Sequence, residues 1–60
     1  MNKRLEELLE KQILTVEEYD ELGEMEEVKE IINNGNSGKY CDKMWYSVYL
    51  HNGEDFDIYL

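Results

Sequence analysis

The side chains best suited to nucleophilic catalysis are one thiol, Cys41, and one imidazole, His51. A cysteine nucleophile needs a histidine base within hydrogen-bond reach. These two residues are expected at opposite ends of one strand, so we predict no Cys–His pair. We expect Cys41 to be a small, buried or half-buried apolar residue and His51 to stand at the shoulder of a hairpin. Because a glycine-rich phosphate loop and a serine in a nucleophile setting are also lacking, the sequence predicts a protein without catalytic residues that is not an enzyme.

Three carboxylates beside a turn glycine, Glu54, Asp55 and Asp57, are the best candidates for a metal site. Carboxylate oxygens suit Ca²⁺ or Mg²⁺. However, Asp55 and Asp57 are expected on one face of a strand while Glu54 points away, and the spacing of an EF-hand loop is missing. We therefore expect edge-strand charges that discourage aggregation, with no metal and no cofactor.

Acidic side chains dominate the chain, since 60 residues carry 15 Asp and Glu against 6 Lys and Arg, a formal net charge of -9. This balance argues against direct binding of nucleic acid or of an anionic membrane. Eight carboxylates stand between residues 17 and 30 beside one base, Lys29: Glu17, Glu18, Asp20, Glu21, Glu24, Glu26, Glu27 and Glu30. On a helix of roughly 20 Å they would lie about 2.5 Å apart along the axis. Duplex DNA carries one charge per ~1.7 Å of its axis when both strands are counted. The predicted helical face would therefore have a charge density in the range of a nucleic-acid backbone.

Helices are expected to position these acids. We predict a first helix that begins near residue 2 or 3 and carries one apolar stripe, Leu5, Leu8, Leu9 and Ile13. Thr15 and Glu18 form a capping box for the next helix. We predict a second helix over 16–22, a joint at Gly23, and a further helix over 24–33. That last helix would bury Met25, Val28 and Ile32.

The C-terminal part predicts a β-hairpin with a two-residue type I′ turn at Asn52-Gly53. This turn would pair Leu50 with Asp55 and set the two faces of the hairpin. The face toward the helices would carry Trp45, Ser47, Tyr49, Phe56, Ile58 and Leu60. The outer face would carry Tyr46, Val48, Leu50, Asp55, Asp57 and Tyr59. A two-stranded hairpin is marginal by itself, so we expect a third strand at 39–41, or a homodimer or a complex.

The predicted fold class is therefore α+β, with two or three short N-terminal helices packed on a C-terminal antiparallel hairpin. We expect a single domain over 1–60, with a helical part at 1–33, a loop at 33–38 and a β part at 39–60. A lone cysteine, the lack of a long apolar run and the lack of a signal peptide predict a cytoplasmic protein that avoids membranes.

Residues 5–19, LEELLEKQILTVEEY, resemble the helix, turn and helix pattern of SHOCT oligomerisation motifs. That pattern usually has a glycine where this chain has Gln12, and it covers less than half of the chain. The resemblance implies self-association.

In general character, a small acidic αβ chain with an aromatic hairpin is similar to phage-encoded inhibitors of host enzymes. These include anti-CRISPR, anti-restriction and uracil-DNA glycosylase inhibitor proteins that mimic nucleic acid. The similarity implies a phage-encoded protein of host takeover, acting in the cytoplasm of the host cell.

Our leading hypothesis is a non-enzymatic inhibitor whose acidic helical face docks into the basic, nucleic-acid-binding cleft of a host or defence protein, such as a nuclease. The residues expected to bind that partner are Glu17, Asp20, Glu21, Glu26, Glu27, Glu30, Tyr46, Asp55, Asp57 and Tyr59. The alternative is a small oligomerisation or adaptor module in which the hairpins form a continuous sheet and the acids are a solvated shell.

Overall fold

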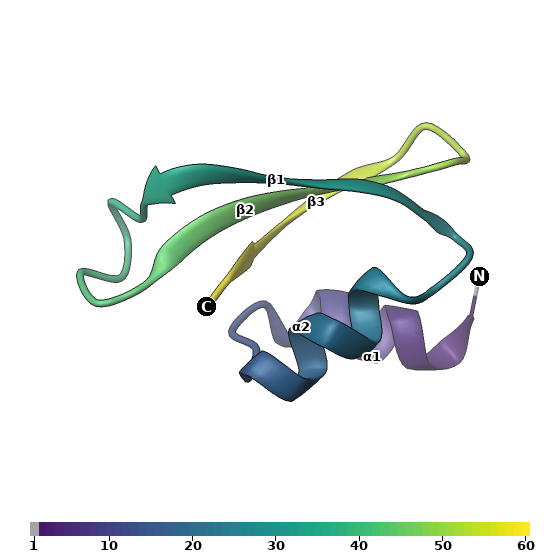
Figure 1. The fold of residues 1–60 in the computed structure, drawn as a ribbon, viewed down its shortest axis with the longest axis horizontal. Coiled ribbons are helices and arrows are strands. Elements are labelled where there is room, and N and C mark those ends of the chain that lie inside the picture. The colour runs from purple at the N-terminus through teal and green to yellow at the C-terminus, as the bar shows by residue number, and fades with distance from the viewer. Residues whose placement is uncertain (1) are drawn as a thin grey trace.

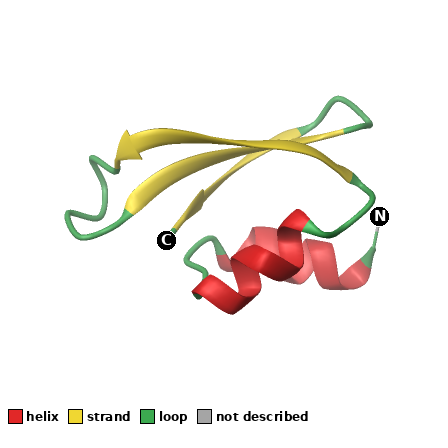
Figure 2. Ribbon diagram, viewed as in Figure 1, coloured by secondary structure: helices red, strands yellow, loops and turns green. Residues whose placement is uncertain are grey.

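The computed structural model describes residues 2–60 as two helices followed by a three-stranded antiparallel sheet (Figure 1). The helices are α1, Lys3–Lys11, and α2, Val16–Gly23; the strands are β1, Val28–Asn36, β2, Met44–Leu50, and β3, Asp55–Tyr59. The strands lie in the order β1-β2-β3, and both helices lie on the same side of the sheet (Figure 2). The predicted α+β class is confirmed.

Helix α1 begins where the sequence predicts it. The Asn2 side chain accepts a hydrogen bond of 2.8 Å from the Arg4 N–H, which satisfies one of the free donors of the first turn. Leu5, Leu8 and Leu9 are buried, so the leucine stripe faces the sheet and the acids between them face solvent.

A sharp turn at Gln12 ends α1 and directs the chain to the sheet. Gln12 has φ 65° and ψ -47°, and the Ile13 N–H reaches the Lys11 carbonyl at 2.7 Å. This is a γ-turn of the strained, positive-φ kind. The turn lets Ile13 form a parallel bridge to Tyr59, with Leu14 donating to the Tyr59 carbonyl at 2.9 Å.

The predicted capping box opens α2. The Thr15 hydroxyl accepts from the Glu18 N–H at 3.2 Å, and the Glu18 carboxylate accepts from the Thr15 N–H at 2.9 Å. The helix ends at Gly23, one residue beyond the predicted end, and buries Leu22.

The predicted helix over 24–33 is wrong, because Val28–Asn36 forms β1. A bulge explains the helix-like spacing of the sequence. Val28 pairs with Leu50 and Glu30 pairs with Tyr49, so one extra residue, Lys29, is inserted in β1. Val28 and Ile31 therefore both pack toward the core although they stand three residues apart. A bulged strand thus imitates the period of a helix.

The predicted hairpin exists, but its register is wrong by one residue. Tyr49 pairs with Asp55, and Leu50 donates to the Glu54 carbonyl at 2.9 Å, which leaves a three-residue loop, 51–53. Gly53 has φ 94°, whereas Asn52 does not have the positive φ that a type I′ turn requires. The observed connection is instead a three-residue hairpin loop whose last residue, Gly53, has the left-handed conformation.

This single-residue shift exchanges the two faces of β2, whereas Phe56 and Ile58 of β3 pack toward the core as predicted. The core cluster combines leucines of the helical part with residues of the hairpin, of which Val48 and Leu50 are predicted outside and Ile58 is predicted inside. Its buried members are Leu5, Leu8, Leu9, Leu14, Leu22, Val48, Leu50 and Ile58. Tyr46 packs against this cluster, while Trp45 is exposed on the other face.

Residues 37–43 connect β1 to β2 and do not supply the third strand predicted at 39–41. Ser37 is buried, and its hydroxyl accepts from the N–H groups of Lys39 and Tyr40 at 3.0 Å. Cys41 is exposed, contrary to the prediction that it is buried or half-buried.

Candidate partner-binding surface

The face of the sheet that points away from the helices combines aromatic and acidic side chains. We call it the open face, and no helix of residues 2–60 covers it (Figure 2). Two cross-strand rows define it: Glu30, Tyr49 and Asp55, then Ile32, Ser47 and Asp57. Alternation along the strands adds Asn34, Trp45 and Tyr59.

Two large apolar side chains are exposed on the open face. Ile32 is 41% exposed and Trp45 is 37% exposed, so both offer apolar contact area on this face. The Trp45 indole N–H donates to the Asp57 carboxylate at 3.1 Å, and the Asn34 amide donates to the Ser47 hydroxyl at 2.7 Å. These hydrogen bonds tie neighbouring strands together and hold the Trp45 ring in one orientation.

The charge of the open face has one sign. Glu30, Asp55 and Asp57 are exposed on it, and none of its nine residues is basic. The Tyr49 ring stands in one row with two of these acids, Glu30 and Asp55. The face therefore combines aromatic contact area with carboxylates, and a partner that covers it must supply positive charge.

Of the aromatic residues predicted to bind a partner, one lies elsewhere. Tyr46 is on the helix side of the sheet, with its ring centroid 5.2 Å from that of Tyr19. Tyr59 lies on the open side, as predicted, and its ring stands edge-on to Tyr40 at 4.9 Å. Sequence reasoning missed Trp45 and Tyr49, which the shifted register moves to the open face.

The acids predicted on one helical face are divided among three elements. Glu17 and Asp20 are exposed on α2, Glu26 and Glu27 lie in the turn before β1, and Glu30 lies on β1. A continuous helical ladder of eight charges is therefore absent from residues 2–60.

Two acids of α2 are paired with bases of α1. The Arg4 guanidinium binds Glu21 through two hydrogen bonds, of 2.8 and 2.9 Å, and Lys11 reaches Glu18 at 2.7 Å. The bond from Arg4 holds the pKa of Glu21 below its usual range, and the bond from Lys11 does the same to the pKa of Glu18. Glu21, which we had expected to bind a partner, instead joins the helices.

The groups considered for catalysis and metal binding lie apart. His51 is exposed in the hairpin loop, and Cys41 is exposed in the connection between β1 and β2. Within residues 2–60, no three His, Cys, Asp or Glu side chains are arranged to hold a metal ion. Neither of the two helices described is long and apolar enough to cross a membrane.

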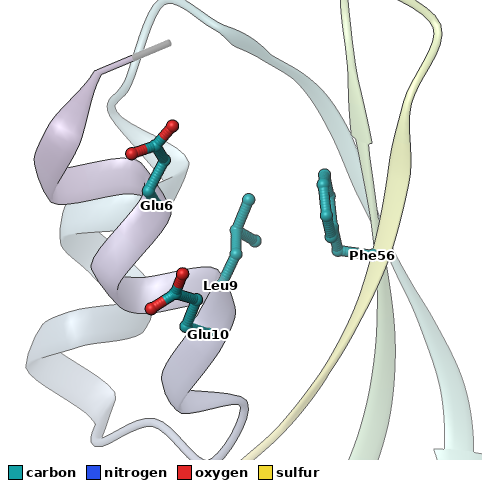
Figure 3. A pocket seen from close by; sticks show the side chains of 4 residues that line it. All are labelled: Glu6, Leu9, Glu10 and Phe56. Carbon is teal, nitrogen blue, oxygen red and sulfur yellow. The ribbon is translucent and has the colours of Figure 1, made fainter.

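The surface is hollowed at two places. A groove of about 300 Å³ between α1 and β3 is lined by Glu6, Leu9, Glu10 and Phe56. Figure 3 shows Leu9 and Phe56 facing each other across this groove, with the two carboxylates on the helix side. A second hollow of about 290 Å³ is lined by Glu27, Leu50, His51 and Asn52.

The chain matches no protein-family model, no curated protein and no solved structure.

Proposed function

We propose that this protein is a non-enzymatic inhibitor that binds the basic, nucleic-acid-binding surface of another protein and excludes nucleic acid from it. The observation that carries the proposal is the open face, where Trp45 and Tyr49 stand among Glu30, Asp55 and Asp57 without a base. This differs from our first hypothesis in the surface that it uses, which is a sheet face instead of a helical ladder.

Aromatic residues in this position are suited to anchor a complex. Trp and Tyr are enriched among the residues that dominate binding energy, because they bury a large area and lose few rotatable bonds. Trp45 is already oriented by its hydrogen bond to Asp57, so ordering this side chain costs little on binding. The acids around the aromatic groups then select a basic surface and reject an acidic one.

The remaining carboxylates act at longer range. With a net charge of -9, the whole molecule is attracted to a positively charged cleft before contact is made. Glu17, Asp20, Glu26 and Glu27 contribute to this field from the helix side and the turn. Their separation from the open face supports a role in association rate more than in the contact itself.

The test is capture from a cell lysate at low salt, followed by identification of the bound protein and competition with a DNA or RNA duplex. We expect a nucleic-acid-binding protein that is released both by the duplex and by rising salt. A bound protein that neither the duplex nor salt displaces would contradict the proposal.

Matched variants connect the captured partner to the open face. Trp45→Ser should lower the affinity for the identified partner by roughly tenfold or more, the loss expected of an anchoring residue. Val16→Ser is the control, because Val16 is 65% exposed on α2, away from the open face. If the two substitutions lowered the affinity equally, the open face would not be the surface that contacts the partner.

A second function, self-association as an adaptor module, is favoured by the free edge of β1. Within residues 2–60 this nine-residue strand pairs only with β2, so its other side offers main-chain groups to a second sheet. Sedimentation equilibrium separates the two functions. The inhibitor is expected to be a monomer before it meets its partner, whereas the adaptor is expected to form a dimer whose assembly survives Glu17→Lys and Glu27→Lys.

A further inference from the structure

The outer edge of β3 is already used by another segment over part of its length. The Tyr59 N–H donates to the Gln12 carbonyl at 2.8 Å, and the Tyr59 carbonyl accepts from the Leu14 N–H at 2.9 Å. The main-chain groups of Tyr59 therefore point away from β2. Because these directions repeat every second residue, those of Asp57 and Asp55 point the same way.

The rest of this edge is uncovered. Among residues 2–60, Gln12 and Leu14 are the residues whose main chain bonds this side of β3, and both meet it at Tyr59. The γ-turn at Gln12 separates α1 from the edge, so the chain before Gln12 leaves the sheet and runs along its helix side. The main-chain groups of Asp55 and Asp57 are left without a neighbouring strand.

The groove between α1 and β3 lies directly beside this free stretch. Its apolar part consists of Leu9 and Phe56, and Phe56 is the residue between the two free aspartates (Figure 3). Glu6 and Glu10 stand four residues apart on α1, so their carboxylates share one side of the groove. Both are exposed, and the ion pairs of the described residues involve other acids.

We propose that an extended, basic segment of a partner protein adds as a strand to β3 at Asp55–Asp57 and places one arginine side chain in this groove. Its main chain supplies the hydrogen bonds that residues 12–14 supply at Tyr59. The arginine side chain opposite Phe56 lies on the same side of the sheet as the Phe56 ring. Its aliphatic stem contacts Leu9 and Phe56, and its guanidinium lies between the carboxylates of Glu6 and Glu10.

Charge identifies the occupant as basic on both sides of the added strand. Glu6 and Glu10 line the groove from α1, and the carboxylates of Asp55 and Asp57 stand on the open face beside the same edge. An acidic segment, including the 17–30 region of a second copy of this chain, would meet like charge on both sides. The basic character of the partner rests on the proposed function, whereas strand addition rests on the edge itself.

The first experiment titrates the ¹³C,¹⁵N-labelled protein with a synthetic peptide, acetyl-Val-Arg-Val-Arg-Val-amide, at low salt. We expect chemical-shift changes at the amides of Asp55, Phe56 and Asp57 and at the Leu9 methyl groups. Two results would overturn strand addition and leave the proposed function standing. One is a set of shift changes confined to Trp45, Tyr49 and Ile32. The other is no binding of the peptide while the whole partner protein is still captured.

Two modified peptides test the main-chain bonds. One carries N-methyl groups on the valines and the other on the two arginines. Only one of these sets of N–H groups points at β3 in an added strand, so we expect one peptide to bind like the parent and the other to lose most of its affinity. Equal effects of the two modifications would contradict strand addition.

Glu10→Gln tests the groove, with Glu7→Gln as the matched control on the same helix. Glu7 is exposed and does not line the groove. We expect Glu10→Gln to weaken binding of the unmodified peptide by about fivefold, the size of one exposed ion pair, and Glu7→Gln to leave it nearly unchanged. The same loss in both variants would show that the peptide responds only to total charge.

Discussion

Gln12 holds a backbone conformation that residues with a side chain rarely adopt. It is the only non-glycine residue with positive φ within residues 2–60, and it forms the γ-turn between α1 and the β3 edge. Strain of this kind costs about 1–3 kcal/mol, while glycine adds an entropy cost of about 0.5–1 kcal/mol. We therefore predict that Gln12→Gly raises the free energy of unfolding by about 1 kcal/mol, as measured by urea denaturation.

Gln12→Ala is the control for this prediction. Alanine shortens the side chain but keeps the Cβ atom that opposes positive φ. A gain from alanine equal to that from glycine would assign the effect to the side chain and would contradict backbone strain.

Glu18 and Glu21 make the contact between the helices sensitive to acid. Hydrogen bonds from Lys11 and Arg4 lower the pKa of these two carboxyls in the folded chain. A lowered folded pKa gives stability that is present above the unfolded pKa and is lost as the pH falls through the folded pKa. We predict that Glu21→Gln is less stable than the unmodified protein at pH 6, and that this difference shrinks between about pH 5 and pH 3.

Thermal unfolding at several pH values measures this difference. Glu17→Gln is the matched control, since Glu17 is an exposed acid one helical turn away. If the difference in unfolding midpoint between Glu21→Gln and the unmodified protein stayed constant down to pH 3, the ion pair would not be the cause of that difference.

At the scale of the element, the hairpin loop depends on Gly53. Its φ of 94° is in the left-handed region, and the loop fixes the register that places Val48, Leu50 and Ile58 in the core. We predict that Gly53→Ala lowers the free energy of unfolding by about 1 kcal/mol in a urea titration.

Gly23→Ala provides the contrast. Gly23 is the last residue of α2, has open space where a Cβ would be, and does not have positive φ. Alanine there should leave stability unchanged or raise it slightly, because it reduces the freedom of the unfolded chain. Equal losses at both glycines would contradict the importance of φ at Gly53.

Local signals predicted part of the architecture well. The leucine stripe of α1 and the Thr15–Glu18 capping box act within one or two turns, so neighbouring residues are sufficient to define them. β1 was missed because its bulge at Lys29 gives Val28 and Ile31 a helical spacing. That bulge depends on pairing with β2, which neighbouring residues alone do not reveal.

The candidate surface was only partly predictable for a related reason. Asn52-Gly53 fits both a two-residue turn and a three-residue loop that ends in a left-handed glycine. The choice between them decides whether Trp45 and Tyr49 face the helices or solvent. The apolar pattern of β2, MWYSVYL, offers apolar residues to both faces and so does not settle the register.

At the scale of the whole molecule, the acids surround the fold instead of forming one stripe. The ion pairs between the helices neutralise Glu18 and Glu21, whereas the open face, the turn before β1 and the exposed side of α1 keep their charge. A 60-residue domain buries only about 60% of the surface that its unfolded chain exposes, less than a larger domain does, so this self-repulsion weighs heavily on its stability.

Salt should therefore have opposite effects on folding and on binding. Screening of the net charge of -9 relieves self-repulsion, so we predict that NaCl from 10 to 300 mM raises the midpoint of thermal unfolding by a few degrees. The same screening weakens the attraction to a basic partner. Differential scanning calorimetry and partner titration, at matched salt concentrations, measure these two effects. Because added salt makes the free protein more stable, a loss of binding at high salt cannot be caused by unfolding. An unfolding midpoint that falls as salt is added would mean that attraction between the helices outweighs repulsion among the acids.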